Sequence, residues 1–412
     1  MAEPLIYRPV TEAEDLEPIA RLAGLAFGTT NAESVEWFEK RVTRPNIRVV
    51  HAKDNPTPLG VTCRIPMGLY LAGKEVPQLG VLGVGVAPEA RGIGVAKQMM
   101  ADCVREMHDD GSPLSALYSA MHPLYRAVGY ENAGLLCDAV IPAGMIPADN
   151  PPAPAGWREA TESDTEGIHA CYAEYARHTH GMLARVEYLW QRIREPKAGP
   201  ARCFVTTDDQ GRIEAYCYYT QARFDAEENT LGTAAGSAMN ITDLAWSTPR
   251  GFSRSRAFLR GFASIVGEIR LSLPPDSPLI HTLPDRRFAF KVREPWMLRI
   301  LDVKSALEAR GYPRGLSATL QLIITDDLIE SNNGLWTLTL DSGTPTASHQ
   351  PDQAAADNPL RIDIRALAPL YTGFTSARTL RAAGRLDASD NTADTADAIF
   401  ATPSTPAMTN MF

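Results

Sequence analysis

The sequence lacks the features that mark several common protein classes. Its six cysteines form no Cys-x-x-Cys pair and its eight histidines show no His-Glu-x-x-His spacing, so we expect no metal site. No stretch approaches the roughly 18 consecutive apolar residues of a membrane span, and the acidic N-terminus does not resemble a signal peptide. Lys and Arg number 40 against 49 Asp and Glu, and this net charge of -9 argues against a nucleic-acid partner. We expect a cytoplasmic protein that has no membrane partner and whose cysteines are buried thiols.

The length of the chain and two breaks in its sequence pattern predict three domains. A chain of 412 residues is too long for one ordinary core. A Pro/Ala-rich segment at 147–157 reads as a linker, and a softer break lies near Leu301, where Asp302 can cap a helix. The predicted domains are therefore 1–146, 147–300 and 301–412. Strands and helices alternate in the first, which predicts an α/β (α+β) fold with mixed sheets and helices on their faces.

Local patterns predict further elements along the chain. An amphipathic helix is expected over Thr11 to Phe27. Leu360, Ile362 and Ile364 alternate with charged residues, which predicts a half-buried strand. His178 and His180 could face one side of a strand, although a surface loop is the preferred interpretation.

The clearest chemical signal lies between residues 84 and 96. A strand with Val84 and Val86 at period two stops at Pro88, and Arg91-x-x-Gly94-x-Ala96 then opens a helix. The first N–H groups of a helix have no internal partner, and the helix dipole favours an anion there. The glycines let a phosphate approach, while Arg91 adds a charge-assisted contact. We expect this turn to hold a diphosphate through Arg91, Gly92, Ile93, Gly94, Val95 and Ala96. The alternative is a tight turn without a ligand.

This strand and turn resemble the GNAT acetyltransferase superfamily, which carries V-x-V-x-P followed by R-G-x-G-x-A. The resemblance implies that the turn binds the pyrophosphate of acetyl-CoA. It also implies that the backbone of Val84, Gly85 and Val86 pairs with the pantetheine arm, and that the thioester lies between two splayed strands. The segments 116–134, 294–313 and 367–386 resemble the enhanced-intracellular-survival family of N-acetyltransferases. That family implies a catalytic GNAT domain, a degenerate GNAT-like domain, a sterol-carrier-like domain and a homohexamer.

The same resemblance implies roles for four residues. Tyr125 would be the general acid that serves the departing thiolate, and the terminal carboxylate of Phe412 would enter the active site as the general base. Phe27 and Trp37 would line the substrate pocket, where aromatic faces suit an ammonium group. The alternatives are a core tyrosine, a frayed C-terminal tail and two core aromatics. Tyr118 is interpreted as a packing residue, and so is Tyr130.

The sequence therefore favours an acetyl-CoA-dependent N-acetyltransferase with a small-molecule primary amine as acceptor, such as an aminoglycoside, a polyamine or lysine. Direct transfer in a ternary complex is expected because no Cys stands in a nucleophile motif. Met411 stands where some relatives acting on polycationic amines carry an acid, which argues against an aminoglycoside and leaves a smaller or less charged amine open. The Pro249-Arg250-Gly251 turn lacks the full motif, so the second domain is interpreted as a scaffold. A non-catalytic acyl-CoA or lipid-binding protein, or a scaffold protein, is the alternative.

Overall fold

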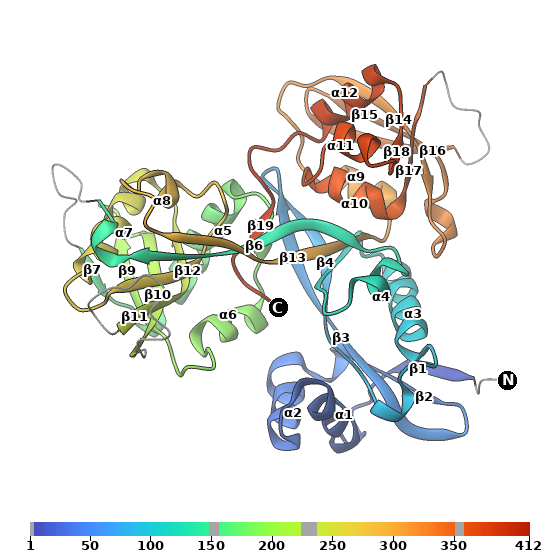
Figure 1. Cartoon of the computed structure of the whole chain (residues 1–412), viewed down its shortest axis with the longest axis horizontal. Helices are drawn as coiled ribbons and strands as arrows, with labels where there is room; N and C mark the ends of the chain where they lie inside the picture. Colours follow the sequence, from blue (N-terminus) through green and yellow to red (C-terminus); the bar gives the residue numbers. More distant parts are fainter. Residues whose placement is uncertain (1–3, 148–155, 224–236, 351–357) are drawn as a thin grey trace.

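The computed structural model describes residues 4–147, 156–223, 237–350 and 358–412, so the predicted linker lies mostly outside the described residues. Figure 1 shows three lobes and places the C-terminus near the point where they meet. We call residues 4–147 the first lobe, 156–300 the second, 301–400 the third, and 401–412 the C-terminal tail. One 14-stranded sheet runs through the first two lobes, and a five-stranded sheet forms the third. No helix in the described ranges is long and apolar enough to cross a membrane.

The first lobe is a mostly antiparallel sheet with helices on both faces. Its strands are β1 (Leu5–Pro9), β2 (Ile47–Ala52), β3 (Asn55–Leu71), β4 (Lys74–Val86) and β5 (Leu114–Tyr118), and its helices are α1 (Glu17–Phe27), α2 (Asn31–Trp37), α3 (Val95–Asp109) and α4 (His122–Arg126). The helix predicted from Thr11 starts later than expected, at Glu17. The Asp15 carboxylate accepts a hydrogen bond from the Glu17 N–H at 3.0 Å, and an ion pair between Arg8 and Glu14 holds the preceding turn against β1.

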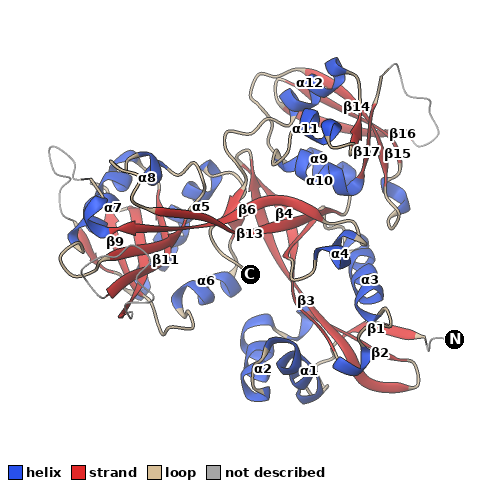
Figure 2. Ribbon diagram, viewed as in Figure 1, coloured by secondary structure: helices blue, strands red, loops and turns tan. Residues whose placement is uncertain are grey.

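The first two lobes exchange strands. β6 (Glu131–Pro142) pairs with β12 (Glu268–Ser272) of the second lobe, and β13 (Ala289–Ile300) lies between β5 and β6. Figure 2 shows β6 and β13 running across the centre of the view, from one lobe into the other. The two lobes therefore share one sheet. The domain boundary near residue 146 stays a prediction of where the chain divides into segments.

The second lobe repeats the arrangement of the first. Its other strands are β7 (Trp157–Glu159), β8 (Leu183–Ala184), β9 (Arg202–Thr207), β10 (Ile213–Arg223) and β11 (Ser237–Trp246), and its helices are α5 (Thr165–His178), α6 (Glu187–Arg194), α7 (Pro249–Gly261) and α8 (Pro278–His281). β11 runs parallel to β12 but pairs with it only over Ala238–Asn240, after which the two strands part. β4 and β5 of the first lobe part in the same way.

The third lobe packs helices on a sheet ordered β16-β15-β14-β17-β18. Asp302 caps its first helix, as predicted, by accepting from the Ser305 N–H at 2.6 Å. The strand predicted through Ile364 is one residue too long, because the Asp363 carboxylate caps a helix that begins at Ile364. The strands are β14 (Ala318–Thr325), β15 (Gly334–Asp341), β16 (Thr344–Gln350), β17 (Leu360–Asp363) and β18 (Leu386–Asp387), and the helices are α9 (Val303–Ala309), α10 (Ile364–Thr372), α11 (Ala377–Ala382) and α12 (Asp390–Ile399).

His180 joins the three lobes, so the surface loop predicted for it is wrong. Only 2% of the residue is exposed. Its Nδ1 accepts from the Ala72 N–H of the β3–β4 turn at 2.9 Å, so the proton lies on Nε2, which donates to the Thr372 carbonyl of the third lobe at 2.7 Å. Burial, and to a smaller extent the nearby Arg310 guanidinium, lower the pKa of His180 to about 4.

Candidate active site

The candidate site is built where β4 and β5 part. The two strands pair in parallel only over Gln78–Gly80, and beyond these residues each keeps only its other neighbour, β13 for β5 and β3 for β4. We call the opening between them the first wedge. A β-bulge interrupts β4 beyond the opening, since Val61 lies opposite Gly85 and Cys63 opposite Leu82. Gly83 in the bulge has a φ of 63°, which a glycine adopts without strain.

The turn after β4 leaves backbone donors free. Gly92 and Gly94 have φ angles of 80° and 93°, and a Cβ at either position would meet nothing within 4 Å. The first hydrogen bond of α3 runs from the Gln98 N–H to the Gly94 carbonyl at 3.0 Å, and no side chain caps the helix. The N–H groups of Val95 and Ala96 have no acceptor among the described residues. An open turn with unpaired donors fits a diphosphate, as the sequence predicts.

Tyr125 is a buried residue whose hydroxyl is unpaired within the part of the chain that the structure describes. The residue lies on α4, is 5% exposed, and packs edge-on against Tyr130 at 6.2 Å between ring centroids. Its hydroxyl bonds to none of the described residues, and burial raises the pKa of Tyr125 to about 12. The Tyr130 hydroxyl is instead paired with the Ser115 hydroxyl at 2.7 Å. Of these two tyrosines, only Tyr125 has a hydroxyl available to a ligand.

The C-terminal tail is packed into the molecule and ends at the first wedge. Its short strand β19 (Ala407–Met408) pairs in parallel with β6. Phe412 is 8% exposed, and its ring lies 5.4 Å from that of Tyr118. A Cβ on Gly80 would lie 2.6 Å from Cε of Met67 and 2.9 Å from Cε2 of Phe412, so the glycine makes room for both side chains where the strands part. The tail is not frayed.

The two predicted pocket aromatics lie in different surroundings. Trp37 sits over the bulge of β4, because a Cβ on Gly83 would lie 3.0 Å from its ring. Tyr188 of the second lobe packs in the same buried cluster as Trp37. Phe27, at the end of α1, is 53% exposed. The structure thus brings Trp37 to the first wedge and leaves Phe27 at the surface.

Sequence reasoning missed three polar residues at this site. The Tyr118 hydroxyl, predicted to belong to a packing residue, donates to the Asn410 carbonyl of the tail at 3.1 Å. The buried Ser119 hydroxyl at the end of β5 has no partner among the described residues and is free to bond to a ligand. Asn410 itself contacts the second lobe. Contacts between residues so far apart in the chain leave no recognisable pattern in the local sequence.

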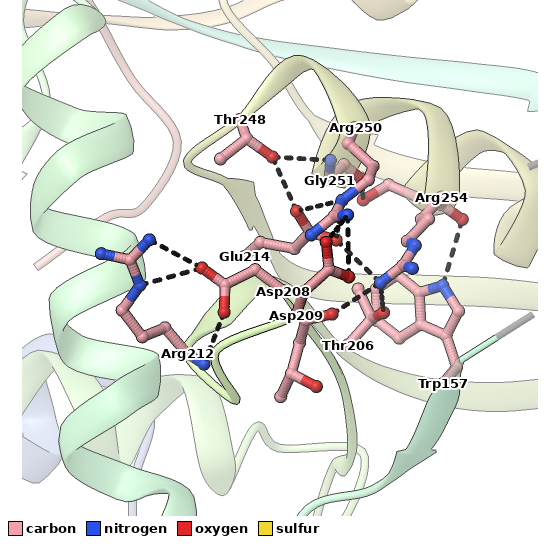
Figure 3. Close-up of polar contacts among 12 residues, drawn as sticks. Trp157, Thr206, Asp208, Asp209, Arg212, Glu214, Thr248, Arg250, Gly251 and Arg254 are labelled. Atoms are coloured by element: carbon pink, nitrogen blue, oxygen red, sulfur yellow. Dashed lines mark hydrogen bonds and ion pairs between the residues drawn. The ribbon is translucent and has the colours of Figure 1, made fainter. Parts of the chain in front are cut away.

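The corresponding turn of the second lobe is closed by its own side chains. Glu214, which is 2% exposed, accepts from Arg254 at 2.8 Å, from Arg250 at 3.1 Å and from the Thr248 hydroxyl at 2.9 Å (Figure 3). The Thr248 hydroxyl in turn accepts from the Gly251 N–H at 2.9 Å at the start of α7. A carboxylate and a capping hydroxyl therefore occupy the place that a phosphate would need.

Among the described residues, no three His, Cys, Asp or Glu side chains gather closely enough to hold a metal ion.

Comparison with known families identifies both of the first two lobes. Residues 7–133 match a family described as an acetyltransferase (GNAT) domain, and residues 181–300 match a second family with the same description. Residues 303–409 match a sterol carrier protein domain. The first two lobes are GNAT domains, and the chain is an acetyltransferase. This confirms the predicted fold class, with two GNAT domains and a sterol-carrier-like domain, and the predicted enzyme class.

Several known proteins are similar to this acetyltransferase over most of its length. N-acetyltransferase Eis of Mycobacterium tuberculosis is 28% identical over 350 residues, which cover 81% of this chain and 80% of that protein. An uncharacterized N-acetyltransferase of Streptomyces avermitilis is 27% identical over 98% of both chains. The crystal structure of a GCN5-related N-acetyltransferase from Anabaena variabilis matches with a TM-score of 0.90 and 28% identity, covering 99% of this chain and 100% of that one.

Proposed function

We propose that this acetyltransferase transfers the acetyl group of acetyl-CoA directly to a primary amine, with both substrates bound together in the first wedge. The observation that carries the proposal is the placement of two groups on opposite faces of that wedge. Phe412 lies against Gly80, whereas Tyr125 belongs to the buried cluster of Val81. Because successive strand residues point to opposite faces, a thioester between the strands would have the tail on one side and the phenol on the other.

The chain offers acetyl-CoA a continuous set of backbone contacts. The diphosphate would bind the N–H groups at the start of α3, with Arg91 beside them, and the pantetheine arm would follow Val84, Gly85 and Val86. The Arg91 Nε already donates to the Val86 carbonyl at 3.3 Å, which holds this side chain at the mouth of the wedge. Bound in this way, acetyl-CoA supplies an acetyl group as a thioester.

The carboxylate of Phe412 binds the ammonium group of the acceptor and acts as its base. A C-terminal carboxylate has an ordinary pKa of about 3.5 and is ionised at pH 7, whereas an amine of pKa about 10.4 is about 99.96% protonated. The carboxylate attracts and orients the ammonium group and accepts its proton, directly or through water. The nitrogen–carbon bond then forms and the carbon–sulfur bond breaks. The products are an amide and a thiol, and exchange with solvent restores both protein groups.

Tyr125 assists the departure of the CoA sulfur. Its pKa of about 12 keeps the phenol protonated throughout the neutral range. A free thiol has a pKa near 8.5, so complete transfer of the phenolic proton would be uphill by about 5 kcal/mol. Tyr125 therefore acts first as a hydrogen-bond donor to the developing thiolate, and its proton follows as the carbon–sulfur bond breaks.

The proposed class of acceptor amine is inferred from the side chains near the first wedge. The Trp37 ring can attract an ammonium group by a cation–π contact. Met411 adds no charge beside the terminal residue. We propose that smaller or less charged amines, such as lysine side chains and short polyamines, react faster than an aminoglycoside.

The test is a thiol-release assay with acetyl-CoA against these three amine classes, using an untagged C-terminus. Tyr125→Phe should lower kcat by about 100-fold or more, the usual scale for a general acid, with acetyl-CoA affinity unchanged. Tyr130→Phe is the matched control, since it removes a hydroxyl that already has a partner, and kcat should remain. Binding of acetyl-CoA without turnover of any amine would contradict the proposed reaction and favour a binding protein.

We further propose a cytoplasmic homohexamer with domains 1–146, 147–300 and 301–412. Light scattering on the purified chain measures the oligomeric state directly, and a monomer would contradict the hexamer.

A further inference from the structure

The C-terminal tail crosses the second lobe before its last residue reaches the first. Asn410 makes the crossing contacts. Its side-chain oxygen accepts from Arg185, and its Nδ2 donates to the Thr242 carbonyl of β11 at 3.4 Å. Its own carbonyl accepts from the Tyr118 hydroxyl of the first lobe at 3.1 Å. Asn410 is thus bonded to both GNAT lobes two residues before the end of the chain.

Arg185 is held rigidly in place by the second lobe. Its side chain is fully buried, and its two terminal nitrogens donate to the Asp243 carboxylate at 2.6 and 2.7 Å. The guanidinium lies 3.5 Å from the ring centroid of Tyr172. A planar guanidinium paired in this fork geometry has little freedom left, so the donor that meets Asn410 is already oriented.

The contact point is the second wedge, the opening between β11 and β12. Thr242 lies two residues beyond Asn240, the last residue of β11 that pairs with β12. Thr409 of the tail lines a small cavity there with residues from both strands, namely Ile241, Thr242, Asp243, Leu244, Leu271 and Ser272. The corresponding opening in the first lobe is the proposed thioester site. In the second lobe the protein's own tail enters this opening.

We propose that the second wedge is a receptor for the C-terminal tail, and that Asn410 and Arg185 are positioning residues for the carboxylate of Phe412. This inference rests on the proposed function, because it assigns the second lobe a role in that reaction. Strand β19 holds the tail in place as far as Met408, its last residue. With Asn410 held as well, the last residue can move through at most about 7 Å, whereas four free residues reach about 14 Å. That difference is about eightfold in accessible volume, so releasing Asn410 should cost about tenfold in rate.

The experiment compares Asn410→Ala with Thr405→Ala in the full-length, untagged protein. Thr405 is a matched control because it lies in the tail before β19, outside the second wedge, and its hydroxyl bonds to none of the described residues. Carboxypeptidase Y releases Phe412 from a loose tail, so its release rate measures docking without any need for activity. Asn410→Ala should raise that rate at least tenfold and lower kcat about tenfold, while acetyl-CoA affinity and the melting temperature stay at the control values.

A double variant separates positioning from a general structural effect. If Asn410 acts only through the terminal carboxylate, Asn410→Ala should not lower kcat further once Phe412 has been deleted. An unchanged release rate in Asn410→Ala overturns the receptor, and faster release with full kcat overturns the positioning role. Full activity after deletion of Phe412 contradicts the proposed base instead, and the release rate alone then decides whether the second wedge holds the tail.

Discussion

Acidification should destabilise the three-lobe assembly through His180. The neutral ring accepts from the Ala72 N–H at one nitrogen and donates to the Thr372 carbonyl at the other. A protonated ring would direct an N–H group at the Ala72 N–H group and would place a charge in a buried site beside Arg310. The folded protein therefore binds this proton less readily than the unfolded chain.

The sign and the size of the effect follow from the two pKa values. The folded pKa of His180 is lowered to about 4 from an ordinary value of 6.5. Between those values the unfolded chain binds more protons, so stability is complete above pH 6.5 and is lost as the pH falls toward 4. Linkage gives a loss of about 2.5 kcal/mol between pH 7 and pH 4.5 from this single group.

The assay is urea unfolding of the wild type and of His180→Gln between pH 7.5 and pH 4.5. Glutamine keeps one acceptor and one donor at this position but does not titrate. The stability difference between the two proteins should shrink by about 2.5 kcal/mol as the pH falls, because carboxylates elsewhere contribute equally to both. Parallel stability curves for the two proteins would refute this reasoning.

Three other substitutions test the wedge and its counterpart. Gly94→Ala should weaken acetyl-CoA binding measured by calorimetry and cost about 1 kcal/mol of stability, because the residue has a φ of 93°; unchanged affinity would contradict the turn as the diphosphate site. Gly80→Ala should displace the Phe412 ring and lower kcat but not acetyl-CoA affinity, so an unaffected kcat would separate the tail from the chemistry. Glu214→Gln should destabilise the second lobe by about 3 kcal/mol in a thermal melt, because two arginines lose their buried partner; a melt equal to the wild type would show that this carboxylate is not needed to close the turn.

The parts of the fold and site that the sequence predicted are those encoded within short segments. The strand, turn and helix from Val84 to Ala96 lie within 13 consecutive residues, so their spacing predicted these three elements directly. The Asp302 cap was predictable for the same reason, because its acceptor and donor are three residues apart. Local hydrogen bonds of this kind depend little on the rest of the molecule.

Features made by distant residues could not be predicted in the same way. His180 appears in the sequence as one of two histidines in a polar segment, and its burial depends on Ala72 and Thr372, which lie in other lobes. Asn410 meets Arg185 across 225 residues of chain. The insertion of β13 between β5 and β6 likewise depends on packing between lobes, which hydrophobic alternation along one strand does not specify.

The closure of the second lobe and the docking of the tail are two parts of one arrangement. Both GNAT lobes contain a wedge between parallel strands that part after a few residues. Where the turn beyond the wedge is open, at Gly94, a diphosphate can bind; where Glu214 closes it, a CoA molecule loses its strongest anchor. A second wedge that held a pantetheine arm would have no room for Thr409 and Asn410. Closure at Glu214 therefore leaves the second wedge available for the tail, as the proposed positioning of Phe412 requires.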